Sequence, residues 1–210
     1  MGQRIGILGG TFDPLHLGHL SAASWAASTL DLDQILFVPA GLPWQKQTVH
    51  ASAEDRFMMV SAAIDDDPRF AVSRIEIDRE GPTYTIDTLR ALRSLPTYEQ
   101  ADLFFITGAD TIAEIDSWKD YDQLTDLAAF VAVTRPGFDS ASDPDQEPTA
   151  IPVIRLDVPG VEVSSTAIRQ RVANGESIDD LTTPNVVRYI DEHRLYSETE
   201  LSPASLVATQ

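Results

Sequence analysis

Short apolar runs alternate with stretches of helical periodicity through most of the chain. The short runs are typical of buried strands, and the stretches between them are typical of helices that cover a sheet. The predicted strands are Ile5–Leu8, Ile35–Val38, Phe70–Ile77, Leu103–Thr107, Phe130–Thr134 and Val153–Leu156. The predicted helices between them are Leu17–Leu30, Ala53–Asp65, Ile86–Leu95, Ala109–Glu114 and Tyr121–Leu127. The second of these follows a predicted capping box formed by Ser52 and Asp55.

This alternation indicates βαβ units, in which helices on the faces of a sheet join parallel strands. The sequence therefore predicts an α/β fold with a Rossmann-like, doubly wound parallel sheet and helices on both faces. Ligands of such sheets bind at the carboxyl ends of the strands, where the strand order reverses. Gly9-Gly10 and Gly108-Ala-Asp110 each follow a predicted strand, so we expect them at such an end.

The chain beyond Val163 predicts two more helices, Ser165–Ala173 and Asn185–His193. With 210 residues in all, we expect one domain over residues 1–196, whose small C-terminal helical segment spans about residues 164–196. Phe138–Pro148 holds four acidic residues without periodicity and is expected to be an exposed loop. Residues 197–210 are small and polar, which favours a disordered tail.

The segment Gly9-Gly-Thr-Phe-Asp-Pro-Leu-His-Leu-Gly-His19 has the residues needed to hold phosphate. Glycines allow a ligand to approach the backbone closely, and the first N–H groups of a helix favour negative charge. His16 and His19 lie on one face of the first helical turn, where they can donate to phosphate oxygens. The alternative is a tight turn with incidental histidines, although half of the four His of the chain are found here. Neither a dinucleotide fingerprint nor a P-loop occurs in the sequence.

A second candidate anion site starts the helix at Val163-Ser-Ser-Thr-Ala-Ile-Arg169. Ser165, Thr166 and the helix N–H groups can donate to phosphate oxygens, and Arg169 can clamp two oxygens from one turn further along. An ordinary N-cap followed by a surface arginine would look the same. Arg171 is on another face of the helix and is interpreted as a solvated charge.

The composition limits the classes of partner that the protein can bind. The net charge of −18, from 15 basic and 33 acidic residues, opposes binding to nucleic acid. A small anion such as ATP with Mg²⁺ needs only a local basic site. No apolar stretch approaches the ~20 residues of a membrane span, and the glycine-rich segment begins too early to leave room for a cleavable signal peptide. We therefore expect no membrane partner and, since Cys is absent, a cytoplasmic protein without thiolate chemistry.

His16-Leu-Gly-His19 resembles the HxGH motif of the adenylyltransferase superfamily, whose paired histidines bind the phosphates of ATP. When the two candidate anion-binding segments are considered together, the chain from about residue 4 to residue 196 resembles the nicotinate-nucleotide adenylyltransferases. The segments that carry the resemblance are Gly9–Leu20, Val38–Lys46, Gly81–Leu89, Gly108–Trp118, Arg135–Gly137, Val163–Arg169 and Val187–Tyr196.

The resemblance implies a set of ATP-binding residues. His16 and His19 would contact the phosphates as catalytic residues, together with Arg169 and with Lys46 from the loop after the second strand. The nucleotide would lie over the residues Gly9, Gly10, Thr11, Phe12, Gly108, Asp110, Ser165 and Thr166. Mg²⁺ would accompany ATP, held mainly by phosphate oxygens and water, because magnesium gives up its water reluctantly. No acidic cluster in the sequence marks a dedicated metal site.

The resemblance also implies a subsite for nicotinic acid mononucleotide. The backbone at Thr85 would meet the nicotinate carboxylate, and Trp118 would supply an aromatic face for the pyridinium, with a second backbone N–H at Lys119. Tyr84 and Arg135 are further candidates for this subsite. Packing alone would explain Tyr84 equally well, and Trp118 has a core indole as its alternative.

The expected reaction is attack of the mononucleotide phosphate on the α-phosphorus of ATP, with release of pyrophosphate. The same chemistry on nicotinamide mononucleotide or phosphopantetheine remains an alternative, although the segments around Thr85 and Trp118 argue against phosphopantetheine. A non-catalytic nucleotide-binding module is the alternative from a different class. The sequence leaves the oligomeric state open, and a homo-oligomer is compatible with it.

Overall fold

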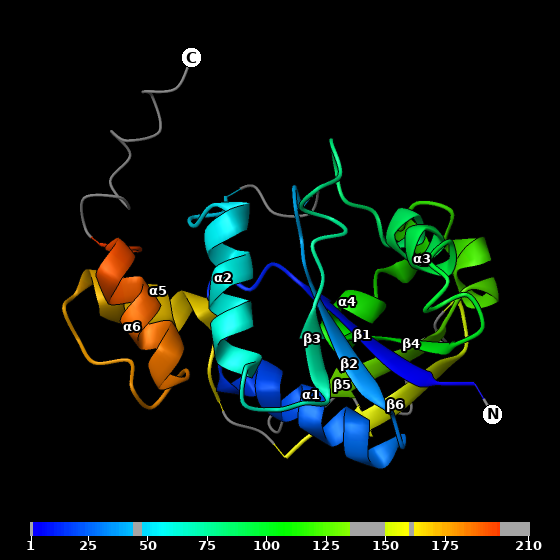
Figure 1. Cartoon of the computed structure of the whole chain (residues 1–210), viewed down its shortest axis with the longest axis horizontal. Helices are drawn as coiled ribbons and strands as arrows, with labels where there is room; N and C mark the ends of the chain where they lie inside the picture. The colour runs from blue at the N-terminus through cyan, green and yellow to red at the C-terminus, as the bar shows by residue number, and fades with distance from the viewer. Residues whose placement is uncertain (1, 44–47, 135–149, 160–161, 198–210) are drawn as a thin grey trace.

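One parallel sheet forms the centre of the protein. The computed structural model describes residues 2–43, 48–134, 150–159 and 162–197, and within them six strands are ordered β3-β2-β1-β4-β5-β6 (Figure 1). The strands are β1 Arg4–Gly10, β2 Gln34–Pro39, β3 Phe70–Val72, β4 Asp102–Gly108, β5 Ala129–Thr134 and β6 Val153–Asp157. All neighbouring strands pair in parallel, which confirms the predicted doubly wound α/β sheet.

Helices connect the strands, and two further helices follow the last strand of the described chain. They are α1 Leu17–Thr29, α2 Ala53–Ile64, α3 Thr85–Arg93, α4 Ala109–Ile112, α5 Ser165–Ala173 and α6 Pro184–His193. Two 3-10 helices, η1 Ile115–Ser117 and η2 Tyr121–Asp126, lie between α4 and β5. None of the described helices is both long enough and apolar enough to cross a bilayer.

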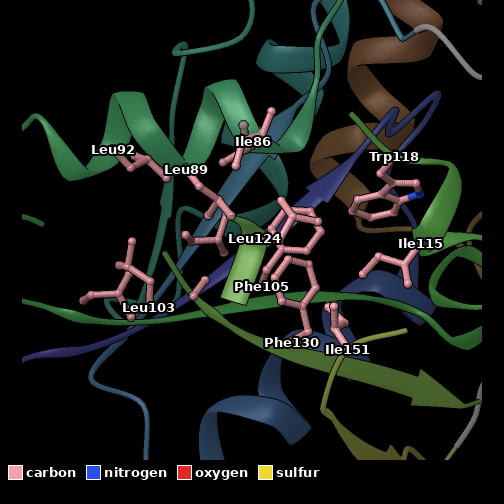
Figure 2. Close-up of a cluster of buried hydrophobic side chains, with 14 of the residues drawn as sticks. Ile86, Leu89, Leu92, Leu103, Phe105, Ile115, Trp118, Leu124, Phe130 and Ile151 are labelled. Atoms are coloured by element: carbon pink, nitrogen blue, oxygen red, sulfur yellow. The ribbon is translucent and has the colours of Figure 1, made fainter. Parts of the chain in front are cut away.

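Alternate residues along each strand point to opposite faces of the sheet, so the core has two layers. On one face, Ile5 and Ile7 of β1 belong to a cluster with α3 that Figure 2 shows. On the other face, Leu8 of β1 belongs to a cluster with α1 and α2. The strands are therefore apolar on both sides, as expected when helices cover both faces.

The strand order reverses between β1 and β4, the two central strands of the sheet. Leu8 of β1 pairs with Ile106 of β4, so Gly10 and Gly108 lie at the same level where the two strands end. The predicted ligand-binding edge is thus formed by the two segments named from the sequence. The glycines at 9 and 10 extend β1 rather than ending it, since they pair with Val38 and Pro39 of β2.

The helices α5 and α6 form a unit at one end of the sheet. They pack beside α2, to the left in Figure 1, and share a third apolar cluster with it. Ile168 of α5, Ile190 of α6 and Met59 of α2 are all buried in this cluster. We call residues 163–196 the C-terminal unit.

Three predicted elements differ from those observed. The strand predicted over Phe70–Ile77 ends at Val72, because β2 ends at Pro39, whose nitrogen has no hydrogen to continue the ladder. The helix predicted over Tyr121–Leu127 is a 3-10 helix, and the helix predicted to reach Glu114 ends at Ile112. Ser52 does cap α2, since its hydroxyl oxygen accepts from the Asp55 N–H at 3.1 Å.

Candidate active site

The turn between β1 and α1 places both histidines at the start of a helix. His16 is the N-cap of α1 and is buried, while its ring stacks on that of His19 with 3.7 Å between the ring centroids. Phe12 has a positive φ of 51°, and its buried ring meets the His19 ring edge-on at 5.0 Å. The two imidazoles are therefore held as one packed pair.

The proton position on His19 follows from its backbone contact. The His16 N–H donates to Nδ1 of His19 at 3.2 Å. Because Nδ1 accepts this hydrogen bond, the neutral His19 ring carries its proton on Nε2, where it is a donor. His19 thus presents a donor to an anion without needing to be charged.

Gly18 lies between the histidines, where a side chain would be tightly confined. A Cβ at this position would lie 3.1 Å from His16 Nδ1 and 3.2 Å from Cγ1 of Val163. The start of the C-terminal unit therefore comes against the first turn of α1. A glycine in the motif allows this close approach.

Helix α5 brings the second predicted anion segment to the same place. Asp13, His16, His19, Thr48, Ser164, Ser165, Thr166 and Arg169 line one cavity of ≈ 410 Å³. The histidines of α1 and Arg169 of α5 thus face one space, although about 150 residues separate them in sequence. This is the juxtaposition that the sequence motifs predicted.

Within α5, the polar side chains have distinct partners. Ser164 caps the helix by accepting from the Ala167 N–H, whereas the Ser165 hydroxyl donates to the Pro14 carbonyl at 2.9 Å. The hydroxyl hydrogen of Ser165 is thus already committed, and its backbone N–H is the group left for a phosphate. Thr166 accepts from Arg169 at 3.2 Å, which leaves its own hydroxyl hydrogen to donate.

The C-terminal unit holds the backbone of the segment Gly9–His19 through a series of hydrogen bonds. Arg169 Nη1 donates to the Asp13 carbonyl at 2.6 Å, and the buried Thr182 hydroxyl donates to the Leu15 carbonyl at 2.8 Å. The Leu17 N–H donates to the Leu181 carbonyl at 3.0 Å. Together with the Ser165–Pro14 bond, these contacts fix the shape of residues 13–17 from outside the sheet.

Asp13 is a buried carboxylate at the junction of three segments. Its Oδ2 accepts from the His50 N–H at 2.8 Å. Its Oδ1 accepts from the Ala51 N–H at 3.0 Å and from the Tyr196 hydroxyl at 2.8 Å. Three donors therefore compensate a charge that would otherwise be costly to bury.

Arg56 of α2 ties together the loops that follow β1 and β2. Its buried guanidinium donates to the carbonyls of Thr11 at 2.8 Å, Gly41 at 3.1 Å and Ala51 at 3.3 Å. Burial lowers the pKa of Arg56, and the negative charge of Asp13 opposes that shift. The bonds to Gly41 and Ala51 fix both ends of the segment that carries Lys46.

A second group of predicted residues gathers at the start of α3. Tyr84 precedes the helix and Thr85 is its first residue, so the Thr85 N–H is free of an intrahelical partner. The Lys119 ammonium lies 4.9 Å from the Tyr84 ring centroid and 2.9 Å from a carboxylate oxygen of Asp87. The segments predicted to hold the mononucleotide thus come together at Tyr84 and Lys119.

Trp118 is packed in the core rather than open to solvent. Its indole is 8% exposed and lies edge-on to Phe105 and Phe130 at the end of the cluster in Figure 2. The indole nitrogen is buried with no hydrogen-bond partner among the described residues. Stacking of Trp118 on a pyridine ring stays a prediction, and in this conformation it requires the indole to turn out of the cluster.

Replacing Trp118 by alanine is expected to raise the KM for nicotinic acid mononucleotide several-fold and to leave the KM for ATP unchanged, since stacking contributes ~0.5–1.5 kcal/mol. The same variant loses ~3–5 kcal/mol of stability, because a cavity opens beside Phe105 and Phe130. Steady-state kinetics at a temperature where circular dichroism shows both proteins folded checks this. Phe130→Leu is the control for packing, and equal changes in the two KM values for Trp118→Ala would contradict the stacking role.

Of the remaining predicted site residues, some lie within the described part of the chain and others lie outside it. Thr11 is half-buried beside the cavity turn, and Gly108 and Asp110 follow β4, with Asp110 exposed in the first turn of α4. Phe12 has its ring in the core, so only its backbone is left for a nucleotide. Lys46 and Arg135 lie outside the described residues, as do the loop Phe138–Pro148 and the tail beyond Ser197.

Three buried polar residues beside the cavity, Asp13, Arg56 and Tyr196, were not predicted from the sequence. A signal existed for Arg56, since it occupies a position on the buried face of α2 shared with Met59, Val60 and Ile64. A charged residue on an apolar stripe indicates a buried polar contact. Nothing local in the sequence pairs Asp13 with Tyr196.

The fold and the cavity define the class of this protein. A parallel sheet with paired histidines at its switch point and an arginine facing them is the arrangement of an HxGH nucleotidyltransferase. The family model described as Cytidylyltransferase-like matches residues 7–171, and the chain belongs to that family.

Comparison with individual relatives assigns the chain to a narrower family. A protein of Leifsonia xyli subsp. xyli named "Probable nicotinate-nucleotide adenylyltransferase" is 52% identical over 194 residues, covering 92% of this chain and 94% of the relative. A protein of Streptomyces coelicolor with the same name is 50% identical and covers 90% of this chain and 98% of the relative. The chain belongs to the nicotinate-nucleotide adenylyltransferase family.

Solved structures agree on the fold. The nicotinic acid mononucleotide adenylyltransferase of Plasmodium falciparum complexed with NaAD superimposes with a TM-score of 0.74 at 22% sequence identity, covering 92% of this chain and 97% of that chain. The same enzyme complexed with APC gives a TM-score of 0.73 at 21% identity. The likeness therefore extends over most of the chain.

Proposed function

We propose that the protein transfers the adenylyl group of ATP to nicotinic acid mononucleotide, giving nicotinic acid adenine dinucleotide and pyrophosphate in NAD biosynthesis. Membership of the nicotinate-nucleotide adenylyltransferase family supports this reaction. The single structural observation that carries the proposal is the cavity that His16, His19 and Arg169 share. Both the N-terminal and the C-terminal part of the described chain contribute donors to this one cavity.

The chemistry needs no protein nucleophile. A 5′-phosphate oxygen of the mononucleotide attacks the α-phosphorus of ATP, and the bond from that phosphorus to the β-bridging oxygen breaks. The electron pair leaves with pyrophosphate, and the attacking phosphate is already ionised at neutral pH. Catalysis then consists of holding the two phosphates in line and compensating the charge that develops.

The residues of the cavity have the donors for this task. In our assignment, His16 and His19 donate to the α- and β-phosphates, and Arg169 clamps the leaving pyrophosphate with the N–H groups that Asp13 and Thr166 do not use. Ser165 and Thr166 donate from the start of α5, and Lys46 adds a charge from its loop. The backbone from Gly9 to Phe12, with Gly108 and Asp110, completes the nucleotide site.

We propose that Mg²⁺ enters as part of the ATP complex. No group of three or more metal-ligating side chains is found among the described residues. Phosphate oxygens and water are therefore the ligands we assign, which suits the coordination habits of magnesium. The ion belongs to the substrate in this scheme.

The acceptor is assigned from the second group of residues. The Thr85 N–H at the start of α3 and the Lys119 N–H suit a carboxylate, and Tyr84 and Trp118 supply aromatic surface. This set favours nicotinate over the uncharged amide of nicotinamide mononucleotide. Arg135 is assigned to the same subsite on the resemblance alone. A cytoplasmic location and a single domain over residues 1–196 also stay predictions.

Pyrophosphate release with ATP and nicotinic acid mononucleotide tests the proposal. We expect kcat/KM at least ~10-fold higher for nicotinic acid mononucleotide than for nicotinamide mononucleotide, because a bound carboxylate gains charge-assisted hydrogen bonds. Chelation of Mg²⁺ is expected to abolish release. No turnover of either mononucleotide by folded protein would exclude the proposed function, and a preference for the amide would overturn the choice of acceptor.

A further inference from the structure

Tyr196 reaches the phosphate-binding turn from the end of the C-terminal unit. Its hydroxyl donates to Oδ1 of Asp13 at 2.8 Å across 183 residues of sequence. Tyr196 is 1% exposed and Asp13 is 4% exposed, so this bond is shielded from water. Removing one partner of a buried, charge-assisted hydrogen bond is costly, because the other partner stays buried.

Asp13 connects this tyrosine to the arginine of the cavity. The side chain of Asp13 accepts from Tyr196, while the main-chain carbonyl of Asp13 accepts from Arg169 Nη1 at 2.6 Å. A shift of the Asp13 backbone therefore moves the carbonyl that accepts from Arg169. Tyr196 and the Ala51 N–H both donate to Oδ1, while the His50 N–H donates to Oδ2.

We propose that Tyr196 is a positioning residue for adenylyl transfer: by holding the Asp13 carboxylate in place, its hydroxyl keeps the Arg169 guanidinium directed at the triphosphate. The proposal rests on the proposed function. It assigns to Tyr196 no contact with either substrate.

Electrostatics give the reason why this hydroxyl matters. Asp13 lines the cavity, and a carboxylate there competes with phosphate for Arg169. With donors from Tyr196, His50 and Ala51 in place, the carboxylate is satisfied without the guanidinium. Without the hydroxyl, Oδ1 keeps only the Ala51 N–H, and we expect the carboxylate to turn toward Arg169, which lines the same cavity. That contact would withdraw Arg169 from ATP.

The donor role of Tyr196 does not vary over the working pH range. Burial raises the pKa of Tyr196 far above its ordinary value, and the negative charge of Asp13 raises it further. The hydroxyl therefore stays protonated and donates to Asp13 wherever the protein is folded.

The chain offers a matched control on helix α6. The Tyr189 hydroxyl also donates to an aspartate, Asp55 of α2, at 3.0 Å. Burial raises the pKa of Tyr189 to about 12, and the bond to Asp55 adds to the shift. Tyr189→Phe and Tyr196→Phe each remove one hydroxyl that ties the C-terminal unit to the rest of the protein, and only Tyr196 is connected to Arg169.

The test compares wild type with the two variants in the full chain. Tyr196→Phe is expected to raise the KM for ATP about tenfold and to leave the KM for nicotinic acid mononucleotide within twofold. The Kd of a non-hydrolysable ATP analogue, measured by calorimetry, should rise by the same factor of about ten. Tyr189→Phe should change none of these by more than twofold, although both variants lose a few degrees in Tm.

The outcomes separate the proposal from a purely structural role. A Tyr196→Phe variant with the wild-type KM and Kd for ATP, or one in which both substrates weaken equally, would overturn it. Equal losses in the two variants would overturn it as well. If wild type does not turn over the mononucleotide, the proposed function fails, and the analogue Kd still decides the role of Tyr196. If wild type does not bind the analogue, both proposals fall.

Discussion

His19→Ala is expected to lower kcat by ~10²-fold or more, a loss of about 2.7 kcal/mol of transition-state stabilisation. The Nε2–H of His19 is a donor of fixed direction, because the His16 N–H occupies Nδ1 and the Phe12 ring packs against the imidazole. Such a donor costs nothing to reorganise when charge develops on the phosphates. Steady-state kinetics with both substrates at saturation measures the effect.

The control for His19 is His193, which lies on α6 with its ring stacked on Tyr189. His193→Ala should leave kcat unchanged within twofold. His19→Gln, whose amide nitrogen reaches about as far as Nε2, should recover part of the lost activity. If folded His19→Ala turns over within threefold of wild type, the histidine has no role in the chemical step.

Arg169→Lys is expected to lower kcat/KM for ATP by ~10²-fold, although the charge is kept. Arg169 donates to the Asp13 carbonyl and to Thr166 with separate nitrogens and still has N–H groups to offer to phosphate. A lysine is a point charge with one nitrogen, so it cannot both rest on Asp13 and clamp two oxygens. Hydrogen bonds to charged groups contribute ~1.5–3 kcal/mol each, which sets the size of the loss.

Arg171→Lys on the same helix is the matched control for this change. Arg171 is partly exposed and pairs with the exposed Asp180 at 2.8 Å, and it does not line the cavity. Its replacement should leave kcat/KM for ATP within twofold of wild type, since exposed ion pairs contribute ~0–1 kcal/mol. The clamp assigned to Arg169 is refuted if both variants behave alike.

Local signals in the sequence were enough to predict the sheet and to mark the two segments that line the cavity. Strand β1 is apolar on both faces, with Ile5 and Ile7 on one face and Leu8 on the other. Motifs mark the histidines at the start of α1 and Arg169 one turn into α5. β3 was predicted too long because the end of its pairing depends on Pro39 of another strand. The point at which a neighbouring strand stops pairing cannot be found in the sequence of β3 itself.

The buried polar contacts were out of reach for a different reason. Asp13 and Tyr196 lie 183 residues apart, and Arg56 bonds to the carbonyls of three loops, which have no side-chain signature. Trp118 was predicted as a substrate contact, and the structure adds that its indole packs against Phe105 and Phe130. Whether a given aromatic packs inward depends on the volume left by its neighbours, and a single sequence does not state that volume.

The hold of the C-terminal unit on residues 13–17 has a consequence during synthesis. A ribosome finishes the first motif long before it adds Thr182 and Tyr196, which bond to Leu15 and Asp13. The growing polypeptide can pair its early strands, but closing so long a loop is entropically expensive and comes late. A chain released before the last helices are translated would therefore carry the histidine motif yet lack the residues whose hydrogen bonds shape it.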